Sequence, residues 1–136
     1  MTLLCPQTLV RLADNFEQGI RDPDFDPLPA ARLFNPLGRA VWLVAEVFPD
    51  DDTLFGLADL GFGCPELGTF SLREINAIHL PLGLRIARDL AFVPEHPLSV
   101  WTAASRLARS IPAAAEFLGG LARADPSAIR LLPRDP

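Results

Sequence analysis

Apolar and polar positions recur with helical spacing near the start of the chain. One apolar stripe contains Leu9, Val10, Leu12, Ala13 and Phe16. Pro6 suits the first turn of a helix, so the pattern predicts an amphipathic helix over residues 6–18. The next segment reads DPDFDPLP, and its three prolines prevent regular backbone hydrogen bonding. We therefore expect an extended linker after the helix.

The pattern then changes to that of β-strands. Residues 40–48 are rich in β-branched and aromatic side chains, and residues 53–60 follow them after a Pro-Asp-Asp-Asp turn, which predicts a hairpin. Both faces of the first strand are mostly apolar, so we expect this strand at the centre of the sheet with helices covering it. Further short strands are expected at 31–34, at 66–70 and within 84–93.

Helical patterns return in three later segments. Ser71 and Glu74 have the spacing of a capping box, which predicts a helix over residues 71–79. After Pro94 the chain is rich in alanine, and we expect helices at 97–109 and 112–123. The sequence thus predicts an α+β fold, in which an N-terminal helix and the capped helix pack on a small, mainly antiparallel sheet and a helical extension follows.

The 136 residues fit one domain, in which we expect three parts. Residues 1–30 form a helix plus linker, residues 31–96 an α+β core, and residues 97–136 a helical extension. Hydrophobic residues make up 49% of the chain, which excludes a disordered protein. The apolar runs are much shorter than the roughly 20 residues of a membrane span. With no export signal at the N-terminus, we expect a cytoplasmic protein without membrane contact.

The ordinary ligands of metals and cofactors are few and badly spaced. Cys5 and Cys64 lie far apart, and the two histidines, His79 and His96, match no zinc pattern with them. The glycines after residue 60 are not followed by the Gly-Lys-Ser/Thr of a phosphate loop. We expect neither a metal nor a cofactor.

Negative charge concentrates in the first half of the chain. Residues 1–70 carry four arginines and eleven acids, whereas residues 71–136 carry eight arginines and six acids. Two aspartate clusters stand out: Asp22, Asp24 and Asp26 in the linker, and Asp50, Asp51 and Asp52 in the hairpin turn. A net charge of −5 argues against direct binding of nucleic acid and suits a basic partner surface. Such turns are most often merely solvated, and no calcium-loop spacing is present.

Two charged residues fall on apolar strand faces. Glu46 would share a face with Trp42, and Arg88 would lie on the apolar face of an extended segment, so we expect a structural Glu46–Arg88 ion pair. Glu46 and Asp59 are the alternative, as an acid/base couple. In the simplest hairpin register they lie about 13 Å apart, beyond the roughly 5–9.5 Å of glycosidase pairs.

Two loop residues are further candidates. Cys64, with His79 and Asp89, supplies the residue types of a cysteine hydrolase, but no helix N-terminus directly follows Cys64 to lower its pKa. Phe62 is expected to be packed, although an exposed Phe62 beside Asp59 would be a good partner contact.

Several short motifs in order resemble an uncharacterised bacterial family called domain of unknown function 2958. These motifs are Leu33-Phe34-Asn35-Pro36, Trp42 with Glu46, Phe55-Gly56, Glu66-Leu67-Gly68, Phe70-Ser71-Leu72, Leu82-Gly83-Leu84 and Arg88-Asp89-Leu90. The resemblance covers about residues 3–97 and leaves out the helices from residue 98 onward. It implies a compact α+β module, common on plasmids, phages and other mobile elements, without known catalytic residues.

These observations favour a non-enzymatic binding protein of mobile-element origin. We expect it to inhibit a host defence complex, in an anti-CRISPR or anti-restriction role, by presenting its acidic residues to a protein with a basic nucleic-acid-binding surface. The expected contacts are Asp22, Asp24, Asp26, Asp50, Asp51, Asp52 and Phe62. The alternatives are a small hydrolase using Glu46 and Asp59 or Cys64, and an interaction module that binds through Trp101 and Phe117 of the C-terminal helices. The sequence does not predict an oligomeric state.

Overall fold

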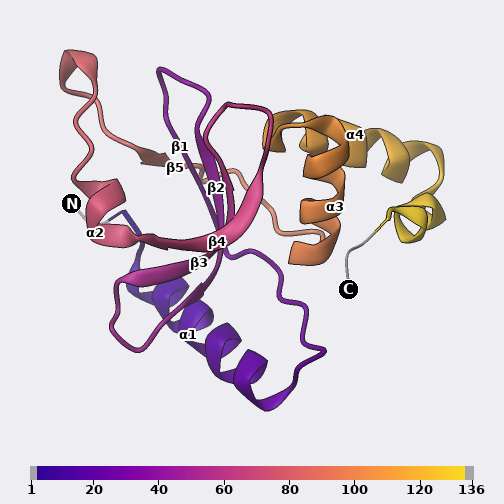
Figure 1. Cartoon of the computed structure of the whole chain (residues 1–136), viewed down its shortest axis with the longest axis horizontal. Helices are drawn as coiled ribbons and strands as arrows, with labels where there is room; N and C mark the ends of the chain where they lie inside the picture. Colours follow the sequence, from indigo (N-terminus) through magenta and orange to yellow (C-terminus); the bar gives the residue numbers. More distant parts are fainter. Residues whose placement is uncertain (1–2, 134–136) are drawn as a thin grey trace.

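The fold is a five-stranded antiparallel sheet between helices, seen in a computed structural model that describes residues 3–133 (Figure 1). Its elements follow in this order along the chain: α1 (Pro6–Arg21), β1 (Ala31–Phe34), β2 (Val41–Val47), β3 (Thr53–Asp59), β4 (Glu66–Ser71), α2 (Leu72–Asn76), the 3₁₀ turn η1 (Pro81–Gly83), β5 (Ala87–Arg88), α3 (Leu98–Ala108), α4 (Ile111–Ala124) and the 3₁₀ turn η2 (Pro126–Leu131). This architecture confirms the predicted α+β fold.

The strands are ordered β4-β3-β2-β1-β5, so the strongly apolar strand β2 lies at the centre. All pairings are antiparallel, and the predicted hairpin is formed by β2 and β3. Both faces of β2 are covered, as its apolar composition predicts. One cluster joins Leu43 to α3 and α4, and the other joins Val44 to Leu12 of α1.

A β-bulge interrupts β2 at Ala45. Val44 pairs with Gly56 of β3, and the next paired residue of β2 is Glu46, opposite Phe55. The backbones approach closely here, because a Cβ built on Gly56 would lie 1.9 Å from the carbonyl oxygen of Leu43. The simplest hairpin register predicts Glu46 opposite Phe55 and Trp42 opposite Asp59. The first pairing is confirmed, but the second is wrong, because beyond the bulge Trp42 pairs with Ala58 and Val41 pairs with Asp59.

The α1 helix begins at Pro6, as predicted, but continues to Arg21. The linker after it is fixed rather than loose, because the carboxylate of Asp26 accepts hydrogen bonds from the amide and hydroxyl of Ser99 in the first turn of α3. In addition, the amide of Leu98 donates to the carbonyl of Pro27 at 2.8 Å. These bonds connect the N-terminal and C-terminal helical parts at one side of the sheet.

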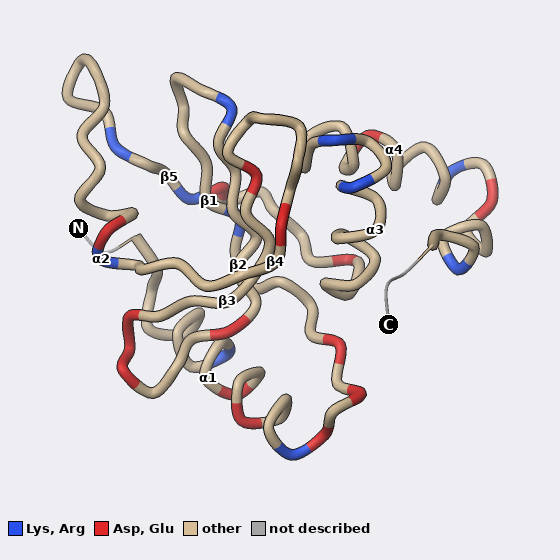
Figure 2. Tube along the Cα trace, viewed as in Figure 1, with Lys and Arg blue, Asp and Glu red and all other residues tan. Residues whose placement is uncertain are grey.

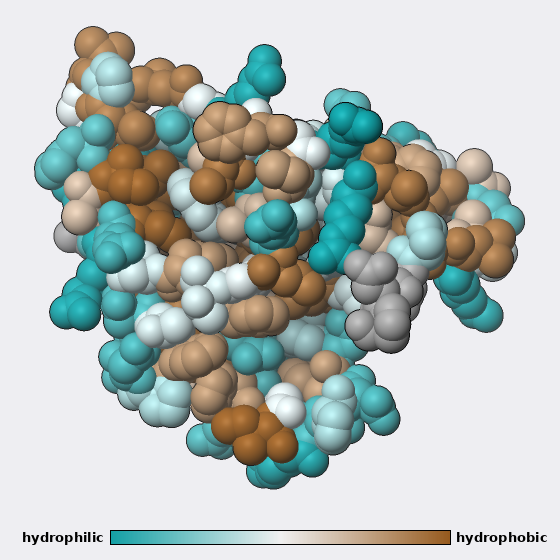
Figure 3. Space-filling model, in the orientation of Figure 1, coloured by the Kyte–Doolittle hydropathy of each residue, from teal (hydrophilic) through white to brown (hydrophobic). Residues whose placement is uncertain are grey.

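The segment from α2 to β5 has less regular structure than its sequence pattern predicts. The capped helix ends at Asn76 instead of residue 79, and β5 spans only two residues. Between them, η1 forms a protruding tip whose Leu82 has a positive φ of 64° and is 90% exposed. Apolar side chains are visible over this tip at the upper left of Figure 3. None of the helices in residues 3–133 has the length and apolar character that crossing a bilayer requires.

Candidate functional site

Negative charge gathers at one end of the molecule, around α1, the segment after it and the turn between β2 and β3 (Figure 2). We call this region the acidic end. It contains Arg11, Asp14, Glu17, Arg21, Asp22, Asp24, Asp26, Glu46, Asp50, Asp51, Asp52 and Arg73. These are nine acids and three arginines, a net charge of −6, whereas the remaining described residues carry seven acids and eight arginines, a net charge of +1.

The β2–β3 turn lies beside α1, since the rings of Phe16 and Phe48 are 4.9 Å apart. Its Asp50 carboxylate accepts hydrogen bonds from the amide of Thr53 at 2.8 Å and from the hydroxyl of Thr53 at 2.6 Å. These bonds favour the ionised form and lower the pKa of Asp50. Asp50 is therefore part of the turn itself and is also a fixed negative charge.

Asp52 connects the turn to α2. Its carboxylate accepts from the Arg73 amide and from the Ser71 hydroxyl, both at 2.8 Å, and these bonds lower its pKa. Arg73 also pairs with it at 3.4 Å, so part of its charge is neutralised. Ser71 in turn caps α2 by accepting a hydrogen bond from the amide of Glu74 at 3.2 Å, which is the Ser71 half of the predicted capping box.

The other aspartates of the acidic end differ in how far they are constrained. Asp51 is exposed and has a positive φ of 56°, and its side chain forms no hydrogen bond or ion pair within residues 3–133. Asp24 is exposed as well, and only its amide is bonded, to the Asp22 carboxylate at 3.0 Å. Because Asp26 caps α3, it is as structural as Asp50 and Asp52. The two clusters thus contain both structural and unengaged carboxylates.

The predicted Glu46–Arg88 ion pair is not formed. Arg88 lies on the edge strand β5, and its guanidinium donates to the sulfur of Cys5 at 3.5 Å. Glu46 lies after the bulge and faces α1, where its carboxylate is close to Gly19. Desolvation raises the pKa of Glu46, and no arginine of the described chain pairs with it. The pair is absent because β5 pairs with β1: Arg88 is opposite Leu33, which is opposite Trp42, so Arg88 lies four residues away from Glu46 along β2.

Asp59 is a buried connector in the structure. It is 2% exposed, and its two carboxylate oxygens accept the amides of Gly61 and Ile111, each at 2.9 Å. The first bond closes the β3–β4 loop and the second holds the start of α4 against the sheet. Glu46 pairs with Phe55, which lies four residues before Asp59 along β3, roughly 13 Å, so the structure does not bring Glu46 and Asp59 together as an acid/base couple.

The structure also does not assemble the proposed cysteine hydrolase. Cys64 is exposed in the loop between β3 and β4. Asp89 follows β5, which is the opposite edge strand of the sheet from β4, and it pairs with Arg32 at 3.2 Å. His79 lies beyond the end of α2, in an isolated bridge with Arg85, and not at a helix terminus.

The exposure of the aromatic candidates differs from the prediction. Phe62 is 83% exposed, so the expectation of a packed side chain is wrong and the contact residue is available. Trp101 is 6% exposed within the core cluster of α3 and α4, and Phe117 is 39% exposed. The C-terminal helices therefore do not present Trp101 to a partner.

Cys5 is a candidate nucleophile that the sequence pattern did not single out. It is the N-cap of the 16-residue helix α1, and its sulfur shares a hydrogen bond with the Thr8 hydroxyl at 3.2 Å. Bonds from the Thr8 side chain, from its amide and from Arg88 lower the pKa of the exposed Cys5 thiol to about 7. The thiol lines a cavity of about 690 Å³. A cysteine directly before the helix-starting Pro6, with a threonine three residues on, was the available signal.

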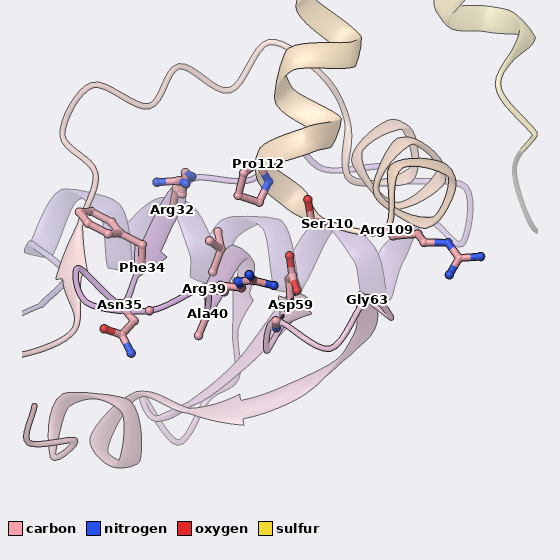
Figure 4. Close-up of a pocket in the computed structure, with 13 residues that line it drawn as sticks. Arg32, Phe34, Asn35, Arg39, Ala40, Asp59, Gly63, Arg109, Ser110 and Pro112 are labelled. Atoms are coloured by element: carbon pink, nitrogen blue, oxygen red, sulfur yellow. Dashed lines mark hydrogen bonds between the residues drawn. The ribbon is translucent and has the colours of Figure 1, made fainter.

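A second cavity, of about 470 Å³, lies where the β1–β2 loop, the β3–β4 loop and the start of α4 meet. Figure 4 shows Arg32 and Phe34 on one side, Ser110 and Asp59 on the other, and Arg39 between them. Within residues 3–133, no group of three or more His, Cys, Asp or Glu side chains is arranged to hold a metal ion.

A family model, described as a protein of unknown function (DUF2958), matches residues 3–112 of the chain. The match is longer than the resemblance read from the motifs, and it includes α3 and the first residues of α4. Comparisons with the curated proteins and with solved structures give no match.

Proposed function

The chain belongs to the DUF2958 family, and from this premise we propose that it is a non-enzymatic binding protein that inhibits a host defence complex. On this proposal it originates from a mobile element and acts as an anti-CRISPR or anti-restriction protein. The acidic end occupies a basic surface on which the partner otherwise holds nucleic acid. The observation that carries the proposal is the segregation of charge, −6 at the acidic end against +1 elsewhere in the described chain.

The local geometry supports this role. The hydrogen bonds of Asp50 and Asp52 lower both pKa values and hold the two carboxylates at fixed positions in the turn. A preorganised array of charges loses little conformational entropy on binding and accelerates encounter with an oppositely charged surface. Asp51 and Asp24 add unengaged charges at the rim of the same region.

The rival functions receive less support. A hydrolase needs at least two reactive groups within hydrogen-bonding reach of one another in a cavity. Glu46 and Asp59 lie toward opposite ends of the β2–β3 hairpin, and Cys64 is distant along the sheet from Asp89. The interaction module needs Trp101 at the surface, and this side chain is in the core.

The test compares two triple variants that remove the same number of negative charges. The first, Glu17→Gln/Asp24→Asn/Asp51→Asn, acts on the acidic end. The control is Glu66→Gln/Glu95→Gln/Glu116→Gln. All six side chains are exposed, and none forms a hydrogen bond or ion pair within residues 3–133, so both variants are expected to fold like the wild type.

Each protein is immobilised and exposed to nuclease-treated extract from a host strain with an active nuclease-based defence, and retained proteins are identified by mass spectrometry. Wild type and control should retain the same nucleic-acid-binding protein, with retention decreasing as salt increases. The variant of the acidic end should no longer retain this protein, and it should no longer raise phage plaque counts on that strain. Equal retention and equal plaque counts for the two triple variants would refute the proposal.

A further inference from the structure

The cavity of about 470 Å³ that Arg39 lines is a preformed pocket. It lies at the opposite end of the β2–β3 hairpin from the acidic end, because it includes Val41 and Asp59, whereas the aspartate turn follows Val47. Asp59 holds its walls in place by bonding the β3–β4 loop and the first residue of α4 at once. Both carboxylate oxygens of Asp59 accept hydrogen bonds from backbone amides, so this carboxylate is already engaged in holding the fold together.

Two guanidinium groups line the pocket, and they differ in their partners. Arg32 is balanced by Asp89 at 3.2 Å and lies over the ring of Phe34, with 5.5 Å between its central carbon and the ring centroid. Arg39 is exposed, and no carboxylate of residues 3–133 forms an ion pair with it. Arg109 belongs to the rim, and its guanidinium points away from Arg39 in Figure 4.

The base of Arg39 is fixed by a glycine. Gly61 has a positive φ of 91°, and a Cβ built on it would lie 2.9 Å from the Cβ of Arg39. The loop thus packs directly against the Arg39 stem, which only a residue without a side chain allows. This contact fixes the stem, and in the view of Figure 4 the charged head lies between Phe34 and Asp59.

The lining has the character of a small-molecule site. Phe34, Val41 and Pro112 supply apolar surface, while Arg39 supplies an unpaired cation. A volume of about 470 Å³ falls within the roughly 300–1,000 Å³ of ligand pockets and is much larger than a bare inorganic anion requires. Guanidinium groups recognise carboxylates and phosphates through paired hydrogen bonds.

We propose that this pocket binds a small organic anion, whose phosphate or carboxylate group is held by Arg39 and whose flat or apolar body lies against Phe34 and Pro112. The site is independent of the partner binding proposed for the acidic end, and either can fail without the other.

Calorimetric titration and thermal-shift measurements on the full chain test the site with four probes: adenosine 5′-monophosphate, adenosine, benzoate and orthophosphate. Binding of the nucleotide, of benzoate or of both supports the site and identifies the head group. Arg39→Gln should weaken that binding about tenfold or more, through loss of a charge-assisted hydrogen bond. Arg123→Gln, an exposed arginine at the far end of α4, is the charge-matched control and should bind like the wild type.

Several results would overturn the assignment. Adenosine binding as tightly as the nucleotide would remove the role of the anion, and orthophosphate binding as tightly would remove that of the organic body. Failure of all four probes, or unchanged affinity in Arg39→Gln, would be equally decisive. Backbone amide shifts on wild-type protein give a readout without any variant: the ligand should move residues 38–41, 61–63 and 109–112.

Discussion

The Cys5 thiol offers a quantitative test of the structure. Its pKa of about 7 depends first on the hydrogen bond with the Thr8 side chain, then on the Thr8 amide and on Arg88. Thr8→Val keeps the shape of a buried side chain and removes only the hydroxyl. The pKa of Cys5 should then rise toward its ordinary value of 9.0, and Arg88→Gln should raise it by less.

The thiolate fraction sets the size of the effect. At pH 7 a thiol with a pKa of about 7 is about half ionised, whereas one with a pKa of 9.0 is about 1% ionised, a difference of roughly fiftyfold. The intrinsic nucleophilicity of a thiolate falls with its pKa, and over two units this reduces the advantage by roughly tenfold. A complete return of the pKa to 9.0 would therefore change the alkylation rate at pH 7 by only about fivefold, and Thr8→Val should change it by less, so the pH at half-maximal rate is the better measure.

The assay follows iodoacetamide alkylation between pH 5.5 and 10 in a Cys64→Ser background, which leaves Cys5 as the only thiol. The midpoint should lie near pH 7 and move upward in Thr8→Val. The same Thr8 change in a Cys5→Ser background should leave the profile of Cys64 unaltered. A midpoint that stays near pH 7 in a folded Thr8→Val variant would refute the assigned role of the Thr8 hydroxyl.

Three further changes test the polar contacts of the fold. Asp59→Ala leaves two amides without their acceptor and should lower the free energy of unfolding by about 2–4 kcal/mol in urea titrations. Asp125→Ala, which removes an exposed capping side chain, should lower it by about 1 kcal/mol or less. Equal losses in the two variants would contradict the role of Asp59 as a buried hydrogen-bond acceptor. Asp52→Asn should lower the melting temperature, because the Asp52 carboxylate holds the start of α2. Asp51→Asn should leave the melting temperature unchanged, since asparagine tolerates a positive φ. A larger loss in Asp51→Asn than in Asp52→Asn would contradict the turn described. Glu46→Gln should raise the free energy of unfolding at pH 7, because the raised pKa of Glu46 means that its ionised form is disfavoured in the folded state. This gain should disappear below about pH 4, where Glu46 is protonated in both the folded and the unfolded state. A gain that persists at about pH 3 would exclude desolvation as its cause.

Local patterns predicted the regular elements well. Pro6 marked the start of α1, the aspartate turn marked the hairpin, and Ser71 marked the start of α2. Each of these signals acts within a few residues, where spacing in sequence determines spacing in structure. The α+β fold and the central place of β2 followed from them.

The sites depended on contacts between distant parts of the chain, which such patterns do not specify. Asp59 bonds to a residue 52 positions later, and Arg88 reaches a cysteine 83 positions earlier. The bulge at Ala45 was also missed, and with it the pairing of Trp42 with Ala58. One signal was present, because an isolated glycine such as Gly56 within a strand pattern indicates a bulge or a close backbone approach.

The bulge in β2 has a consequence for how the family can vary in length. With Ala45 as the additional residue, Val47 rejoins the α1-side cluster that contains Val44. Deleting one residue there would reverse the inward and outward positions of the hairpin tip relative to its base, and insertion of another would do the same. Homologous chains should therefore conserve the number of residues between Val44 and the turn.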